Sequence, residues 1–189
     1  MGYVVLACRC MLGLVFVASV MGKVRGRGAF AGFVRATGRL GPGWVVSRVP
    51  AGVLAGGVLA AEAAVPVLLV LPETARAGFV LAGLLALAFT VTVMAALRRR
   101  DRAPCNCFGA STRPVGGVHL VRNVVLAVSA ALGLAAGAAA GPLEPAGVVA
   151  AMVAGVVAAA VMVTSDDLAD LFRPGVAPHD YRPTKGLLR

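Results

Sequence analysis

The sequence predicts an all-α membrane protein, a polytopic bundle of about five transmembrane helices. Of its 189 residues, 59% are hydrophobic and 14% are charged, whereas soluble domains carry about 25% charged residues. The apolar residues form five stretches, each close to the ~20 residues that cross the hydrocarbon core of a bilayer as a helix. The 24 glycines suit membrane helices whose backbones approach closely. The lipid bilayer is therefore the first expected partner.

The predicted helices span residues 3–21, 49–71, 77–97, 118–140 and 146–164. We expect them to form one transmembrane domain, residues 3–164, followed by a cytoplasmic tail, residues 165–189, that is partly disordered. The tail begins with a pattern typical of a short capped helix, residues 166–172. The last two stretches are rich in alanine, so a four-helix arrangement with a partly inserted last segment is the alternative.

The distribution of Lys and Arg predicts the orientation in the membrane. Basic residues without acidic ones fill the loop at 23–48, and further ones follow the third helix and occur in the tail, whereas the opposite side has only Arg76 between helices. The positive-inside rule then places the N-terminus outside and the C-terminus in the cytoplasm of a plasma-membrane protein. The net charge of +10 thus reflects topology, and we expect no nucleic-acid partner.

The first basic loop carries apolar residues at helical spacing. Phe30, Phe33 and Val34 fall on one side of a helix turn, with Arg35 and Arg39 nearby. This pattern fits an amphipathic helix on the inner leaflet and an irregular basic loop equally well.

Cys105 and Cys107 form a Cys-x-Cys pair between the third and fourth predicted helices. A disulfide at this spacing closes a small, strained ring and exchanges readily. Nearby Arg residues favour the thiolate, the reactive form. Two unreactive thiols are the alternative. A metal site is less favoured because His119 would supply only a third ligand, whereas structural zinc takes four.

A second pair, Cys8 and Cys10, lies inside the first apolar stretch. Residues two apart on a helix point to different faces, so packed, unbonded cysteines are the favoured interpretation.

Several polar residues fall inside the predicted helices. Arg9 in the first helix and Glu62 in the second lie at similar estimated depths in the outer half of the membrane, which predicts an ion pair. The alternatives are that Arg9 extends outward and that Glu62 stays protonated or serves a substrate path. Arg122 and Asn123 lie near the inner end of the fourth helix, where Arg122 could also reach the interface.

Glycines at four-residue intervals predict close helix packing. One such seam comprises Gly133, Gly137 and Gly141 on the fourth helix, and a second comprises Gly52 and Gly56. General enrichment in small residues is the alternative explanation.

The segment Cys105-Asn106-Cys107-Phe108-Gly109, followed by Arg122-Asn123 at the start of an apolar helix, resembles the MauE family of methylamine-utilisation membrane proteins. That family groups with DoxX-like redox-associated membrane proteins. Leu14-Val15-Phe16 leading to Lys23, and Glu62 in the second helix, also match the family pattern. The resemblance covers about residues 3–140.

The resemblance implies a role in protein maturation. MauE proteins are associated with maturation of the disulfide-rich small subunit of methylamine dehydrogenase and are thought to act with a thioredoxin-like partner. It suggests that Cys105 and Cys107 exchange electrons and that Arg122 tunes the thiolate. The expected supporting residues are Asn123, Phe108, Gly109, Glu62 and Arg9.

Two alternatives to this redox function stay open: a small transporter or export factor with Glu62 in a polar pathway, and a non-catalytic membrane partner. The sequence has no nucleotide-binding or haem-attachment motif, and a membrane quinone is compatible with it as a cofactor. The expected cytoplasmic location of Cys105 and Cys107 conflicts with a periplasmic oxidase. Either the pair takes electrons from cytoplasmic thiols, or the orientation is reversed.

Overall fold

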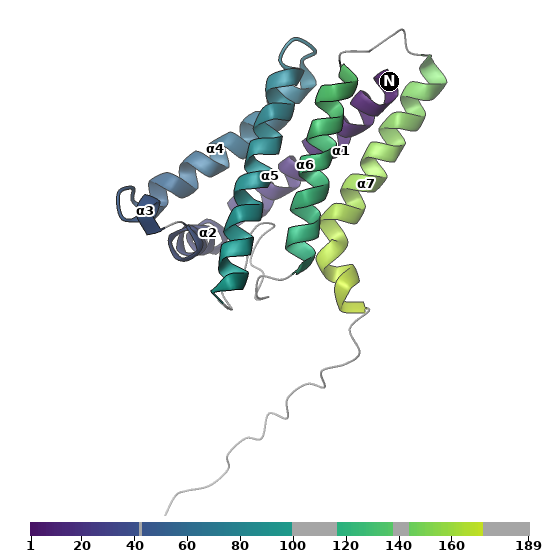
Figure 1. Ribbon diagram of the computed structural model, residues 1–189. Helices are drawn as coiled ribbons and strands as arrows, with labels where there is room; N and C mark the ends of the chain where they lie inside the picture. The colour runs from purple at the N-terminus through teal and green to yellow at the C-terminus, as the bar shows by residue number, and fades with distance from the viewer. Residues whose placement is uncertain (42, 100–116, 138–143, 172–189) are drawn as a thin grey trace, which may run out of the picture.

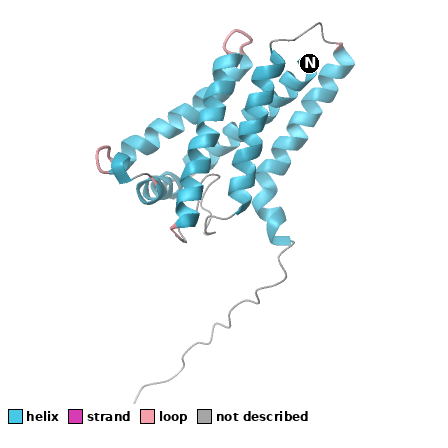
Figure 2. Cartoon of the chain, viewed as in Figure 1, coloured by secondary structure: helices cyan, strands magenta, loops and turns pink. Residues whose placement is uncertain are grey.

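The computed structural model describes residues 1–41, 43–99, 117–137 and 144–171. Over these residues the chain forms helices and no strand (Figure 2). Five helices are long, and each is apolar enough to cross a bilayer. The helices are α1 (Gly2–Val24), α2 (Arg27–Leu40), α3 (Gly43–Val46), α4 (Ala51–Val70), α5 (Ala75–Arg98), α6 (Gly117–Gly137) and α7 (Pro145–Leu171).

The five long helices alternate in direction, as expected for segments that each cross a membrane (Figure 1). The N-terminus and the turn between α4 and α5 lie at one end of the bundle. The short helices α2 and α3 lie at the other, together with the end of α5 and the start of α6. We call this second end the basic end, because the exposed basic residues of these segments gather there. They are Arg25, Arg35, Arg39, Arg48, Arg98 and Arg99.

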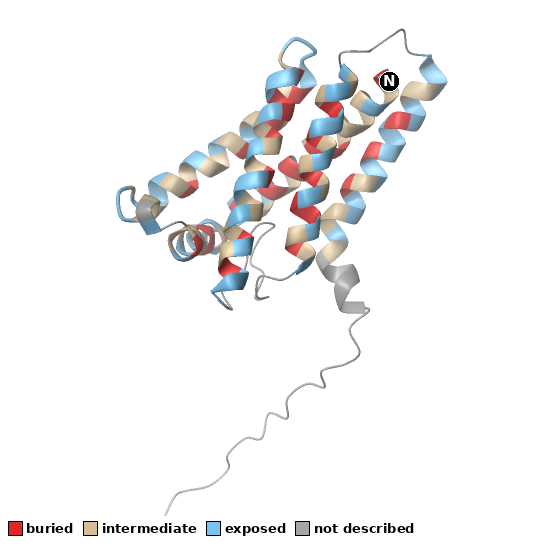
Figure 3. Ribbon diagram, viewed as in Figure 1, coloured by how far each residue is buried: buried red, intermediate tan, exposed pale blue. Residues whose placement is uncertain are grey.

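The core of the bundle lies where α1 meets α4, α5 and α6. Leu12 and Val65 are fully buried there, and the ring of Phe79 is almost fully buried. The outward faces are also apolar, as at Val53, Val121 and other exposed valines and leucines (Figure 3). An apolar exterior around an apolar core is the pattern of a helix bundle surrounded by lipid. The prediction of an all-α membrane bundle is therefore confirmed.

Helices α1 and α7 pack closely through small residues. Gly147, Ala151, Gly155 and Ala159 recur every four residues on α7. The two alanines are buried, the ring of Tyr3 lies directly over Gly147, and a Cβ added to Gly155 would lie 2.7 Å from both the Ala7 carbonyl oxygen and the Cys10 Cβ. At Gly155 the two helices approach without a large side chain between them, whereas Gly147 leaves room for the Tyr3 ring.

The glycine seams predicted from the sequence are mostly wrong. Gly133 does serve close packing, because the ring of Phe79 occupies the space beside it. In contrast, Gly137, Gly52 and Gly56 face open space, with no atom near an added Cβ. Gly141 lies outside the described residues. Four-residue spacing identifies a face of a helix, but it does not tell which face meets another helix.

The first basic loop forms an amphipathic helix, which decides between the two sequence interpretations. Gly26 has a φ of 101°, a conformation that favours glycine, and it lets α2 turn away from α1. Phe33 and Leu40 are buried against the bundle, whereas Arg35 and Arg39 are not buried. The apolar face of α2 therefore packs on the other helices of the bundle.

The last helix is longer than predicted. Residues 165–171 continue α7 instead of forming a separate capped helix. No proline or glycine interrupts the chain between Ala159 and Leu171, so nothing in the sequence forces a break there.

Candidate functional site

The most buried charged residues form a cluster between α1 and α4. The Nζ atom of Lys23 lies 2.7 Å and 2.6 Å from the two carboxylate oxygens of Glu62 and 2.7 Å from the Ser19 hydroxyl oxygen. The Ser19 hydroxyl also lies 3.4 Å from one Glu62 oxygen. Lys23 is 1% exposed and Glu62 is fully buried. The two opposite charges thus compensate each other inside the bundle.

Two aromatic rings accompany the ammonium group. The Nζ of Lys23 lies 4.8 Å from the ring centre of Phe33 on α2 and 5.9 Å from that of Phe89 on α5. Both distances are within the range of a cation–π interaction. The lysine therefore contacts three other helices, and α2 helps to bury its charge.

The predicted ion pair between Arg9 and Glu62 is wrong. The Nε of Arg9 donates to the Leu69 carbonyl at 2.6 Å, and its Nη2 donates to the Val70 carbonyl at 2.6 Å. These carbonyls belong to the last turn of α4, where no further helical N–H is available. A cation is also favoured there by the helix dipole. Arg9 therefore bonds to these free carbonyls, and Lys23 takes the place beside Glu62 that the predicted pair gave to Arg9.

The first two turns of α6 carry a buried polar face. His119, Arg122 and Asn123 are 6%, 3% and 5% exposed, so Arg122 does not extend to the surface as the alternative interpretation supposed. Arg122 and Asn123 line a small cavity together with Ser19 and Phe89. Its volume of about 20 Å³ is enough for one water molecule. This cavity brings the polar face of α6 next to the Lys23–Glu62 cluster.

The predicted exchanging pair, Cys105 and Cys107, lies outside the described residues, as do Phe108 and Gly109. The described chain ends before them at the end of α5 and resumes after them at the start of α6. Cys8 and Cys10 are described and carry free thiols, in agreement with the interpretation as packed membrane cysteines. Among the described residues, no group of three potential metal ligands of the His, Cys, Asp and Glu types comes together.

Lys23 is the site residue that the sequence analysis missed. It was counted with the basic loop because it follows the apolar stretch. A helical signal was available, since Leu12, Val15, Ser19 and Lys23 share one face of a single helix at intervals of three and four residues. The first three are core residues, so the fourth had to be buried if the helix continued.

Comparison with known proteins extends these observations. The family model described as methylamine utilisation protein MauE matches residues 1–136. The chain belongs to the MauE family. The match includes α1 to α5 and nearly all of α6, and therefore both the ion pair and the polar face of α6. No curated protein and no solved structure matches the chain.

Membership in the MauE family, together with the five apolar helices, makes this a multi-pass membrane protein linked to methylamine utilisation. The helix that the family match leaves out is α7, the same helix that packs on α1 through small residues. The buried ion pair and the polar face of α6 form the polar centre of this MauE-family domain.

Proposed function

We propose that this MauE-family protein is a membrane thiol–disulfide redox component that assists maturation of a partner protein. Cys105 and Cys107 are the exchanging pair in this proposal. The observation that carries it is the buried polar face at the start of α6, where His119, Arg122 and Asn123 directly follow the cysteine-bearing connection. In this proposal the Arg122 guanidinium favours the thiolate, as a neighbouring cation does.

The proposed reaction is a dithiol–disulfide exchange with a thioredoxin-like partner. A thiolate of the partner attacks one sulfur of the Cys105–Cys107 disulfide, so that bond breaks and a mixed disulfide forms. The second partner thiol then resolves the mixed disulfide. Two electrons and two protons pass to the Cys105–Cys107 pair, and the partner gains one disulfide. The reverse reaction returns the disulfide to Cys105–Cys107 and reduces the partner to its dithiol.

Glu62 and Arg9 have structural roles in this proposal. Both oxygens of Glu62 already accept from Lys23, and Arg9 binds the end of α4. These contacts hold α1 and α4 in register, which positions Ser19 beside Arg122 in the small cavity. A transport pathway through Glu62 has less support, because the carboxylate is fully buried and paired.

We also propose that the protein resides in the plasma membrane with its N-terminus outside and its basic end in the cytoplasm. The support is the gathering of exposed Arg residues at that end of the bundle, which matches the positive-inside rule. The Cys105–Cys107 pair would then meet reducing cytoplasmic partners.

The test is thiol trapping in native membranes. Membranes are equilibrated in buffers of defined dithiol–disulfide ratio, quenched with acid, and labelled with a maleimide that adds mass per free thiol. We expect one two-electron transition, lost in Cys105→Ser and in Cys107→Ser and unchanged in the matched control Cys8→Ser/Cys10→Ser. Maturation of the client protein should fail with the first two variants only. Full maturation by Cys105→Ser/Cys107→Ser would overturn the proposal.

A further inference from the structure

A larger cavity lies between α2, α3, α4 and α5 at the basic end of the bundle. Its volume is about 220 Å³, more than the about 150 Å³ that accommodates a benzene molecule in an apolar protein cavity. It exists because α4 and α5, joined by a short turn at one end, diverge toward the other, where α2 lies between them and α3 lies at the start of α4 (Figure 1). The side chains of these four helices do not fill the space between α4 and α5, and they leave one chamber there.

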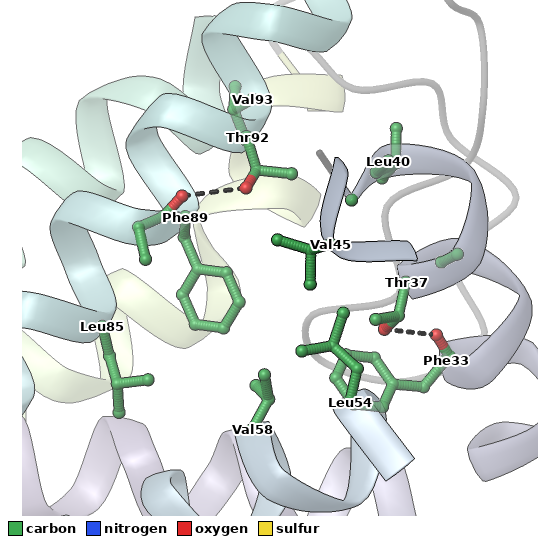
Figure 4. A pocket seen from close by; sticks show the side chains of 13 residues that line it. Phe33, Thr37, Leu40, Val45, Leu54, Val58, Leu85, Phe89, Thr92 and Val93 are labelled. Atoms are coloured by element: carbon green, nitrogen blue, oxygen red, sulfur yellow. Dashed lines mark hydrogen bonds between the residues drawn. The ribbon is translucent and has the colours of Figure 1, made fainter. Parts of the chain in front are cut away.

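The chamber is enclosed on opposite sides by residues of different helices (Figure 4). Phe89 and Leu85 of α5 face Thr37 and Phe33 of α2 across it, with Val58 of α4 along a third side. Phe33 and Phe89 are the same rings that contact Lys23. The chamber and the buried ion pair therefore share two aromatic walls.

Thr37 and Thr92 are the only polar side chains among the 13 lining residues (Figure 4). Each hydroxyl donates its proton within its own helix, Thr37 to the Phe33 carbonyl at 2.9 Å and Thr92 to the Ala88 carbonyl at 2.9 Å. Each oxygen can therefore still accept a hydrogen bond but has no proton left to donate. A ligand with two hydrogen-bond donors can therefore bond to acceptors on two different helices, α2 and α5.

We propose that this chamber binds the ring of a membrane-soluble para-benzoquinol with an apolar tail. Such a ring carries two hydroxyl donors on opposite edges, which suits acceptors on α2 and α5, and its faces can stack on Phe33 or Phe89. Since the chamber lies among helices whose outer faces are apolar, the tail can extend into the bilayer. A lipid acyl chain has the apolarity but lacks the donors. The inference does not depend on Cys105 and Cys107.

Binding is measured with the full chain in nanodiscs, under anaerobic conditions, using a labelled benzoquinol that carries a ten-carbon tail. We expect saturable binding of one quinol per chain. Ala88→Phe places a ring in the chamber, because Ala88 lines it, and should weaken binding about tenfold or more. The matched control is Ala77→Phe, another exposed alanine of α5, which does not line the chamber and should bind as the wild type does.

A second pair of variants tests the hydrogen bond and does not alter the size of the chamber. Thr92→Val should weaken binding about fivefold, as expected for a lost hydrogen bond. Thr90→Val is its control, because Thr90 donates to the Ala86 carbonyl at 2.7 Å and does not line the chamber. If Ala88→Phe fails to fold, the comparison of Thr92→Val with Thr90→Val still tests whether the chamber binds the quinol. Unsaturable binding, equal binding by Thr92→Val and Thr90→Val, or displacement by decanol as effective as by unlabelled quinol would overturn the proposal.

Discussion

The ammonium nitrogen of Lys23 lies within hydrogen-bond distance of both carboxylate oxygens of Glu62, although the two residues belong to different transmembrane helices. Lys23 ends the apolar face of α1, and Glu62 lies in the middle of α4. The pair therefore fixes the position of α1 relative to α4 along the helix axes. Because Phe33 covers the same nitrogen, the pair also fixes where α2 docks.

Lys23→Met should strongly destabilise the protein, because it leaves a buried carboxylate without its cation. The expected loss is about 3–5 kcal/mol, and Glu62→Gln should lose a similar amount. The double variant should lose less than the sum of the two. Unfolding in detergent micelles by a denaturing surfactant measures all three. Arg25→Met, at an exposed basic residue between α1 and α2, serves as the control. Strictly additive losses in the double variant would argue against the ion pair.

Arg9→Gln should destabilise the protein independently of Glu62. The variant loses hydrogen bonds to the carbonyls of Leu69 and Val70, and we expect a cost of about 1–2 kcal/mol because the site is only partly buried. The same unfolding assay, applied to Arg9→Gln/Glu62→Gln, should give additive losses. A large coupling between the two sites would instead support the ion pair that the structure contradicts.

Glycines of α7 should differ sharply from Gly137 in their tolerance of larger side chains. Gly155→Leu forces a side chain against Ala7 and Cys10, and we expect a loss of at least about 1–3 kcal/mol from overpacking. Gly137→Leu should change stability by less than about 0.5 kcal/mol, because open space lies beside it. Yield in membranes and melting temperature in detergent compare the two. Equal effects would contradict the assignment of the α1–α7 seam.

Arg122→Gln should slow alkylation of Cys105 and Cys107 at neutral pH about three- to tenfold, because in the proposed site the Arg122 cation favours the thiolate. The rate is measured with iodoacetamide in a Cys8→Ser/Cys10→Ser background. Arg122→Lys should restore part of the rate, whereas a purely packing role would not distinguish Lys from Gln. Arg48→Gln, at an exposed residue of the basic end, should leave the rate unchanged.

An impermeant maleimide should label Cys105 and Cys107 only from the cytoplasmic side. In the same background without Cys8 and Cys10, intact cells should give no labelling and inverted membrane vesicles should give ready labelling. The expectation follows from the basic residues on both flanks of the pair. Ready labelling of intact cells would reverse the proposed orientation.

The membrane bundle could be predicted from the sequence because each transmembrane helix is determined by its own continuous stretch of residues. Each helix is a continuous apolar stretch, and the length needed to cross a bilayer is fixed by helix geometry. Proline and glycine marked the boundaries of α4 and the break before α7. The helical nature of α2 was visible in Phe30 and Phe33, but its apolar spacing alone could not exclude a loop.

The partners of the buried charges could not be predicted in the same way. Pairing depends on the tilt and rotation of each helix, which a depth estimate along straight helices leaves out. Arg9 donates to carbonyls at the end of α4 that have no helical N–H partner. Every helix end has such acceptors, but no sequence motif identifies them as a binding site. Lys23 follows the last apolar residues of the first stretch and resembles a loop residue in sequence, although it lies in the last turn of α1 and pairs with Glu62.

Lys23 and Glu62 lie far apart along the sequence, and this affects how the helices enter the membrane during synthesis. The lysine leaves the ribosome first and stays without its carboxylate until α4 has been synthesised. Glu62 in turn enters the bilayer as part of an otherwise uncharged helix, and a lone charge near the middle of a helix opposes insertion by about 2.5–3.5 kcal/mol. An α1 already in place offers the arriving carboxylate a cation. Membrane insertion of α4 is therefore coupled to α1, and it should become less efficient when Lys23 is replaced.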